Sequence, residues 1–178
     1  GFLGREVVIQ KLGQRVLLID NDPQGHATLA LGLAESDFSL STYDLYLNDD
    51  ILVEDACLQV APRLDLVPAS VELSAVEPRL AGVEGRELRL RDVLRRSAMP
   101  YDVVLLDCPP AVGALTFNAL LACGELLVPV DASTYSRQAV GKLQETLEVL
   151  RERKGHDVVT RLVLSNYDLR SRFARALR

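Results

Sequence analysis

Two short apolar segments that each end in an aspartate constrain the fold of this chain more than any other feature. Residues 16–19 (Val-Leu-Leu-Ile) run into residues 20–25 (Asp-Asn-Asp-Pro-Gln-Gly), and residues 103–106 (Val-Val-Leu-Leu) run into residues 107–110 (Asp-Cys-Pro-Pro). Continuous apolar runs of this length are typical of strands buried in a parallel sheet. Because open α/β sheets bind ligands at the carboxyl ends of their strands, these aspartates predict a metal–phosphate site.

The rest of the chain alternates between strand and helix patterns. Buried strands are predicted over residues 15–20, 64–68, 101–107, 125–130 and 158–165. Helices are predicted over residues 25–33, 41–47, 86–97, 115–122, 134–151 and 169–178, with a further helix beginning at Ser70; Ser41 and Ser70 are the candidate N-caps. We therefore predict an α/β fold with a doubly wound, mostly parallel sheet, in a single domain over residues 1–178.

Composition narrows the class of protein. Of the 178 residues, 48% are hydrophobic and 25% are charged, which is typical of a globular domain. No apolar run approaches the roughly 20 residues that span a bilayer, so no membrane partner is expected. The three cysteines are far apart and odd in number, which excludes a zinc-finger pattern and a disulfide framework. We predict a cytoplasmic protein.

The charge is concentrated at one end. Residues 151–178 carry eight basic and three acidic side chains, a charge of +5, so the other 150 residues carry −10 of the total −5. A basic segment on an acidic body indicates either a polyanionic partner or an ordinary solvated helix surface. The candidate contacts to the phosphates of such a partner are Arg170, Arg172 and Arg175.

The strand-tip aspartates suit different roles. Asp107 follows four apolar residues and precedes a rigid Cys-Pro-Pro turn, so it is the candidate to hold Mg²⁺ through a water molecule. Asp22 lies on the turn beyond the first strand, where it could orient an attacking water. Asp20 is closer to the sheet and is either a second metal-side carboxylate or a structural residue.

Several motifs together resemble the ParA-type partition ATPases of the ParA/MinD group, which carry a deviant Walker A motif. The matching segments are residues 15–28, 64–70, 101–110 (the Walker B and switch II region), 114–120, 126–130 and 163–170. The resemblance implies a P-loop NTPase-like fold that binds ATP and Mg²⁺, with nucleotide contacts from Pro109 and Asn166. It also implies a nucleotide-dependent homodimer, slow ATP hydrolysis, nonspecific binding to nucleoid DNA, and a ParB-like centromere-binding partner that stimulates hydrolysis.

One motif of that family does not occur in this sequence. The 178 residues contain no G-x-x-x-x-G-K-[ST] loop, which in such proteins binds phosphates through backbone N–H groups and a lysine. The chain is therefore expected to be truncated at both ends relative to the family and to bind ATP poorly. Three readings stay open. The first is a ParA-type ATPase for DNA or plasmid partitioning with the nucleotide loop lost from this chain, and the second is a non-catalytic pseudo-ATPase that serves as an interaction module. The third is another member of the same fold group, such as a MinD-like positioning ATPase or a regulator of polysaccharide synthesis. The Asp-Pro-Gln-Gly turn favours ParA over MinD.

Overall fold

The computed structural model describes residues 13–130 and 134–164, which belong to two compact units. The N-terminal unit ends at Ala122 and the C-terminal unit begins at Cys123. The single domain expected over residues 1–178 stays a prediction, and each unit is described by itself.

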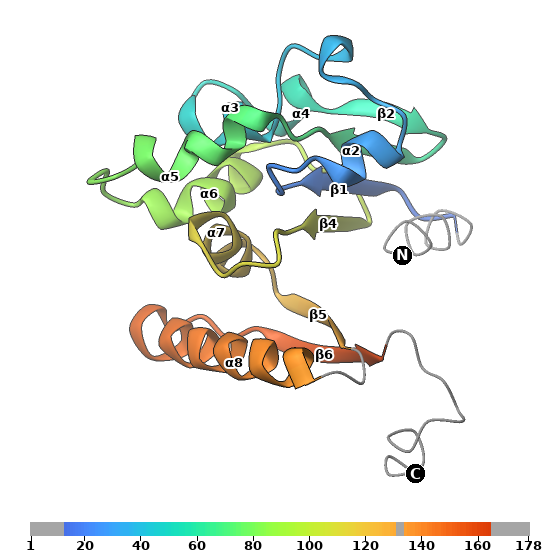
Figure 1. The fold of residues 1–178 in the computed structure, drawn as a ribbon. Helices are drawn as coiled ribbons and strands as arrows, with labels where there is room; N and C mark the ends of the chain where they lie inside the picture. The colour runs from blue at the N-terminus through green and yellow to red at the C-terminus, as the bar shows by residue number, and fades with distance from the viewer. Residues whose placement is uncertain (1–12, 131–133, 165–178) are drawn as a thin grey trace, which may run out of the picture. The chain divides into compact units, whose positions relative to one another are not determined.

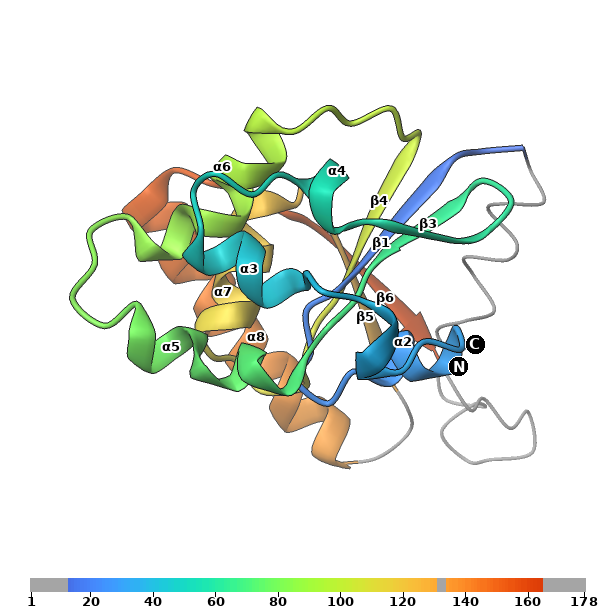
Figure 2. The ribbon, with the colours of Figure 1, turned by 90° about the horizontal axis from the view of Figure 1, so that it is seen from above.

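A four-stranded sheet with the order β2-β3-β1-β4 forms the centre of the N-terminal unit. Its strands are β1 (Val16–Asp20), β2 (Leu58–Ala61), β3 (Leu64–Val67) and β4 (Val103–Asp107). The strands β3, β1 and β4 run side by side and parallel, as Figure 2 shows, whereas β2 pairs with β3 in the antiparallel direction. The predicted mostly parallel sheet is therefore confirmed, with one antiparallel strand at its edge.

Helices cover both faces of this sheet. They are α2 (His26–Ala30), α3 (Thr42–Leu47), α4 (Val53–Ala56), α5 (Val76–Arg79), α6 (Arg89–Arg96) and α7 (Ala114–Ala122), together with the short 3₁₀ turns η1 (Glu35–Asp37), η2 (Val71–Ala75) and η3 (Arg86–Leu88). Because successive side chains of a strand point to opposite faces, Leu17 and Ile19 enter a core shared with α3, α5, α6 and α7, while Leu18 packs with Ala27 of α2. Burial on both faces explains why the first four residues of β1, Val16 to Ile19, are all apolar.

The C-terminal unit contains one β-α-β arrangement. Strands β5 (Glu125–Val130) and β6 (Val159–Leu164) pair in parallel, and the long helix α8 (Thr134–Lys154) connects them (Figure 1). Parallel neighbours need such a crossover connection because a short turn cannot return the chain to the same end of the sheet. Among the residues that the structure describes, no helix is both long and apolar enough to span a membrane.

Several predicted helices differ in extent from the observed ones. The helix expected over residues 25–33 covers only His26–Ala30, because Gly25 and Gly32 both take a positive φ. The helix expected over residues 86–97 is divided into the turn η3 and the helix α6. The predicted basic helix over residues 169–178 lies outside the described residues.

The two serines expected to begin helices behave differently. Ser41 begins α3 as expected, because its hydroxyl accepts a hydrogen bond from the backbone N–H of Tyr43. Ser70 also lies at the N-cap position, that of the 3₁₀ turn η2, which runs into α5, but its side chain makes no capping hydrogen bond. Its hydroxyl instead lies 3.2 Å from the hydroxyl of Ser41 in a shared hydrogen bond. The short elements β2 and α4 were not predicted, because four residues are too few to show a period.

Candidate functional site

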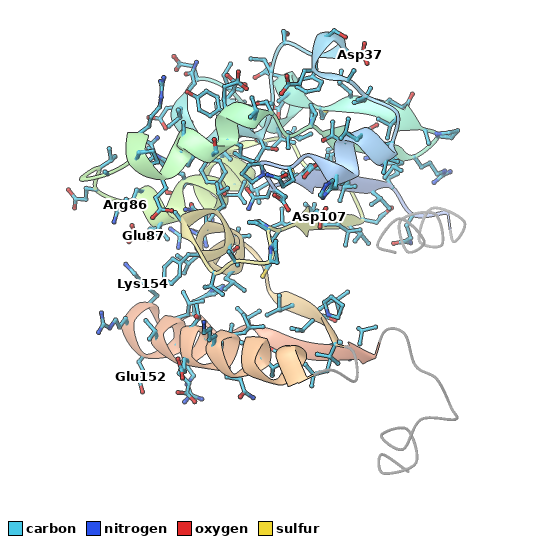
Figure 3. The ribbon with its side chains drawn as sticks, viewed as in Figure 1. Asp37, Arg86, Glu87, Asp107, Glu152 and Lys154 are labelled. Carbon is cyan, nitrogen blue, oxygen red and sulfur yellow. The ribbon has the colours of Figure 1, made fainter. Side chains whose placement is uncertain are left out.

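The two strand-tip aspartates are neighbours at the carboxyl edge of the sheet. Asp20 of β1 and Asp107 of β4 are paired in the parallel register, and the backbone N–H of Asn21 donates to the carbonyl of Asp107 at 2.8 Å. Figure 3 shows Asp107 at the end of β4, where the chain turns towards α7. The residues Asp20, Asn21, Asp22 and Asp107 are called the strand-tip cluster below. The sheet thus brings together residues that are far apart in the sequence.

Asp20 is fully buried and holds the start of α2 against β1. Its Oδ2 accepts hydrogen bonds from the backbone N–H of Thr28 at 2.8 Å and from the Thr28 hydroxyl at 2.7 Å. Its Oδ1 accepts from the N–H of Asp22 at 3.3 Å. Burial raises the pKa of the Asp20 carboxyl, and the hydrogen bonds from Thr28 oppose that rise. Of the two roles considered for Asp20, this set of donors supports the structural one.

Asp22 lies on the turn that follows β1 and is half-buried. Its Oδ1 accepts a hydrogen bond from the backbone N–H of Gln24 at 3.0 Å, and its carbonyl accepts from the N–H of Gly25 at 2.9 Å. Gly25 has a φ of 59°, a left-handed conformation that glycine adopts without steric cost. The turn therefore fixes the position of Asp22 and leaves its other carboxylate oxygen without a hydrogen bond from the described residues.

Asn21 ties this turn to two helices and was not predicted from the sequence. It is fully buried; its Oδ1 accepts from the Tyr46 hydroxyl of α3 at 3.0 Å, and its Nδ2 donates to the carbonyl of Leu115 in α7 at 3.1 Å. The Thr42 hydroxyl of α3 donates to the carbonyl of Asp20 at 2.8 Å. In the sequence, the only indication of this network was an uncharged polar residue between two aspartates. That pattern does not predict which residues Asn21 would contact.

The remaining predicted site residues divide into two groups. Pro109 is half-buried in the bend that connects β4 to α7, so it lies close in sequence to Asp107 at the same edge of the sheet. Asn166, Arg170, Arg172 and Arg175 lie outside the described residues. The structure therefore places the predicted catalytic and metal-side residues and Pro109, and does not place the residues predicted to contact the base or DNA.

The strand-tip cluster supplies only one part of a site for Mg²⁺ and a nucleotide. Mg²⁺ is commonly held by one or two carboxylates together with water and substrate phosphates, which suits Asp107. The described residues contain no cluster of three or more His, Cys, Asp or Glu side chains that could hold a metal by themselves. The three lysines of the chain are Lys11, Lys142 and Lys154, and none follows a glycine-rich loop. The strand-tip cluster therefore fits the part of such a site that holds the metal, and it does not supply the groups that bind the phosphates.

Comparison with known proteins defines the class to which this fold and site belong. Residues 6–160 match the family described as AAA domain (AAA_31), and the chain belongs to that family, the group of ParA-type partition ATPases. It is 33% identical to the sporulation initiation inhibitor protein Soj of Bacillus subtilis over 86% of this chain and 60% of that protein. It is 36% identical to the chromosome partitioning protein ParA of Caulobacter vibrioides over 89% of this chain and 61% of that protein.

Solved structures show the same architecture. Cobyrinic acid a,c-diamide synthase from Mycobacterium smegmatis, crystallised with an ATP analog and magnesium, superposes with a TM-score of 0.86 at 30% identity, covering 95% of this chain and 69% of that one. This likeness confirms the P-loop NTPase-like α/β fold. The chain spans about 60% of the length of Soj and of ParA, so the activity of a whole partition protein is a proposal for this one.

Proposed function

We propose that this chain is the carboxylate-bearing part of a ParA-type ATPase that positions DNA or another cellular cargo. The observation that carries the proposal is the register pair Asp20–Asp107, which places Asp107 beside the turn of Asp22 at the ligand-binding edge of the sheet. Family membership supports the same edge as the nucleotide site.

The two half-buried carboxylates, Asp107 and Asp22, have separate roles in this proposal. Asp107 holds Mg²⁺ through a water molecule, and Asp22, fixed by its turn, orients the attacking water. Asp20 keeps α2 on the sheet, Pro109 shapes the loop after β4, and Asn166 contacts the base. The phosphates require a glycine-rich, lysine-containing loop that the 178 residues do not contain. When bound, Mg²⁺ would neutralise charge on the phosphates.

The partners follow from the same family. We propose that the ATP-bound protein forms a homodimer, that it binds DNA without sequence preference through Arg170, Arg172 and Arg175, and that a ParB-like centromere-binding protein stimulates hydrolysis. The setting would be cytoplasmic and associated with the nucleoid, with no membrane partner. Chromosome partitioning is favoured as the process because Soj and ParA are among the curated relatives.

Isothermal titration with ATP and Mg²⁺ tests the proposal. The 178-residue chain should show no micromolar binding, because the phosphate loop is missing. A version extended at its N-terminus by the glycine-rich loop of a ParA relative should bind ATP and hydrolyse it slowly. Micromolar binding of ATP by the unextended chain would contradict the inference that the missing loop is needed to bind the phosphates. An extended version that never binds ATP would favour the non-catalytic interaction module.

Variants of the extended version separate the two carboxylates. Asp22→Ala should retain nucleotide and lose about 10²–10⁴-fold in hydrolysis, since it removes the water-orienting group. Asp107→Ala should instead weaken the Mg²⁺-dependent part of binding. Asp50→Ala is the matched control, because Asp50 is exposed and lies on a loop before α4. Phosphate release from Asp22→Ala equal to that of the control would make the catalytic assignment wrong.

A further inference from the structure

A cavity of about 170 Å³ lies at the end of the sheet opposite the strand-tip cluster. It is lined by Arg15, Gln59, Arg63, Asp65, Pro100 and Tyr101. Arg15 directly precedes β1, Arg63 precedes β3 and Tyr101 lies just before β4, so the cavity is at the amino ends of the three parallel strands. No part of the proposed ATPase function uses these residues. The cavity is called the amino-end cavity below.

The walls of the amino-end cavity are held by hydrogen bonds to neighbouring strands. The Tyr101 hydroxyl donates to Oδ2 of Asp65 at 2.8 Å, which fixes the tyrosine ring against β3. The backbone N–H of Arg15 donates to Oδ2 of Asp102 at 2.7 Å, and the Arg15 carbonyl accepts from the N–H of Asp102 at 2.9 Å. The main chain of Arg15 is therefore anchored, while its exposed guanidinium has no hydrogen-bond or ion-pair partner within residues 13–130 and 134–164.

Arg63 has a left-handed backbone conformation at the edge of the cavity. Its φ is 62°, and it is the only non-glycine residue with a positive φ in the described parts of the chain. Arg63 lies in the two-residue turn that joins the antiparallel strands β2 and β3, and tight hairpin turns commonly hold a residue in this left-handed conformation. The guanidinium of Arg63 donates to the carbonyl of Gly13 and lines the same cavity as Arg15. The turn thus places a second arginine in the lining, next to Arg15 across the β1–β3 pair.

The charges and the size of the cavity define the ligand that it suits. The lining holds two arginines and one aspartate, Asp65, and the carboxylate of Asp102 accepts from the N–H of Arg15 next to it, so the local charge is close to balanced and suits a monoanion better than a phosphate dianion. Its volume is well below the roughly 300–1,000 Å³ of sites for drug-sized ligands, which excludes a whole nucleotide. Guanidinium groups bind planar carboxylates through two parallel hydrogen bonds. We propose that the amino-end cavity binds a single carboxylate group, through Arg15 and Arg63.

Titrations followed by ¹H–¹⁵N NMR of the 178-residue chain test this site. Sodium acetate, added at constant ionic strength, should shift the amide signals of Arg15, Arg63 and Tyr101 in a saturable way, and inorganic phosphate should bind more weakly. The peptide acetyl-Gly-Glu-Gly-amide is compared with its glutamine counterpart to separate two sources of the carboxylate. Tighter binding of the glutamate peptide than of acetate assigns the site to an acidic side chain, and tighter binding of acetate assigns it to a free small acid.

Three variants decide whether the guanidinium groups are responsible. Arg15→Gln should weaken acetate binding about tenfold or more, the effect of losing one charge-assisted pair. Arg63→Asn should do the same, and asparagine tolerates the left-handed backbone, so the turn is preserved. Arg95→Gln on α6 makes the same charge change away from the cavity and should leave binding unchanged. The proposal would be overturned if Arg15→Gln and Arg95→Gln bound acetate with equal affinity. It would also be overturned if the amide shifts never saturated, or if phosphate bound more tightly than acetate.

Discussion

The Asp20 carboxylate shows how a residue at the carboxyl edge of the sheet can serve the fold. It is fully buried, and its two oxygens accept hydrogen bonds from Thr28 and Asp22. The Thr28 hydroxyl in turn accepts from the backbone N–H of Ala69 at 3.0 Å, which connects α2 to the segment after β3. An aspartate at a strand tip is therefore not by itself evidence of a metal ligand, and the hydrogen bonds decide its role.

The titration of Asp20 gives a prediction at the residue scale. Burial raises the pKa of this carboxyl above its ordinary value of 3.8. Below pH 3.8 the group is protonated in both the folded and the unfolded state, so its favourable contribution to the free energy of unfolding is fully present there. That contribution is lost as the pH rises through the raised pKa of the folded state. The stability of the parent relative to Asp20→Asn should therefore fall over this range.

Urea unfolding of both proteins at a series of pH values measures this difference. Asp50→Asn, which makes the same substitution at an exposed aspartate, is the control. A difference between parent and Asp20→Asn that stays constant with pH would show that burial does not govern the Asp20 carboxyl.

At the scale of secondary-structure elements, Asn21 connects the end of β1 to α3 and α7. Asn21→Ala should destabilise the protein by about 1–3 kcal/mol because the buried Tyr46 hydroxyl loses its hydrogen-bond acceptor. Loss of the hydrogen bond to the Leu115 carbonyl should cost about 0.5–1.5 kcal/mol more. Tyr46→Phe removes only one of the two bonds and should cost less. Urea unfolding of the two single variants and the double variant measures the coupling. Additive effects, within about 0.5 kcal/mol, would contradict a shared network.

At the scale of the whole molecule, the uneven charge predicts how DNA would be bound. The segment 151–178 carries +5 against −10 on the remaining residues, so DNA should be bound locally and through its phosphates. In the version that carries a phosphate loop, changing Arg170, Arg172 and Arg175 to Ala should weaken binding to every duplex sequence. The slope of log affinity against log salt should become shallower by about 0.9 for each phosphate that the variant no longer neutralises.

Binding to random duplex DNA at several salt concentrations checks this prediction. The matched control replaces three arginines of α6, Arg91, Arg95 and Arg96, with Ala and makes the same change in net charge. The control should keep the salt slope of the parent. If both triple variants behave alike, the C-terminal arginines are part of an ordinary solvated surface.

The sequence by itself was enough for the parts of the protein that depend on local patterns. Uninterrupted apolar runs predicted β1 and β4, and the parallel pairing of two such strands implies that Asp20 and Asp107 end at the same edge. Ser41 marked the start of α3 because an N-cap depends on residues within one turn. The family motifs were recognisable for the same reason, since each is a contiguous segment.

Only the tertiary structure decided the features whose partners are distant in the chain. Asn21 meets Tyr46 and Leu115 across separations of 25 and 94 residues, and no period or local motif encodes those hydrogen bonds. The amino-end cavity likewise exists because β1, β3 and β4 align Arg15, Arg63 and Tyr101. Side-chain hydrogen bonding and burial depend on which elements pack together, so the sequence located the strand tips, and packing determined which of their polar groups became structural.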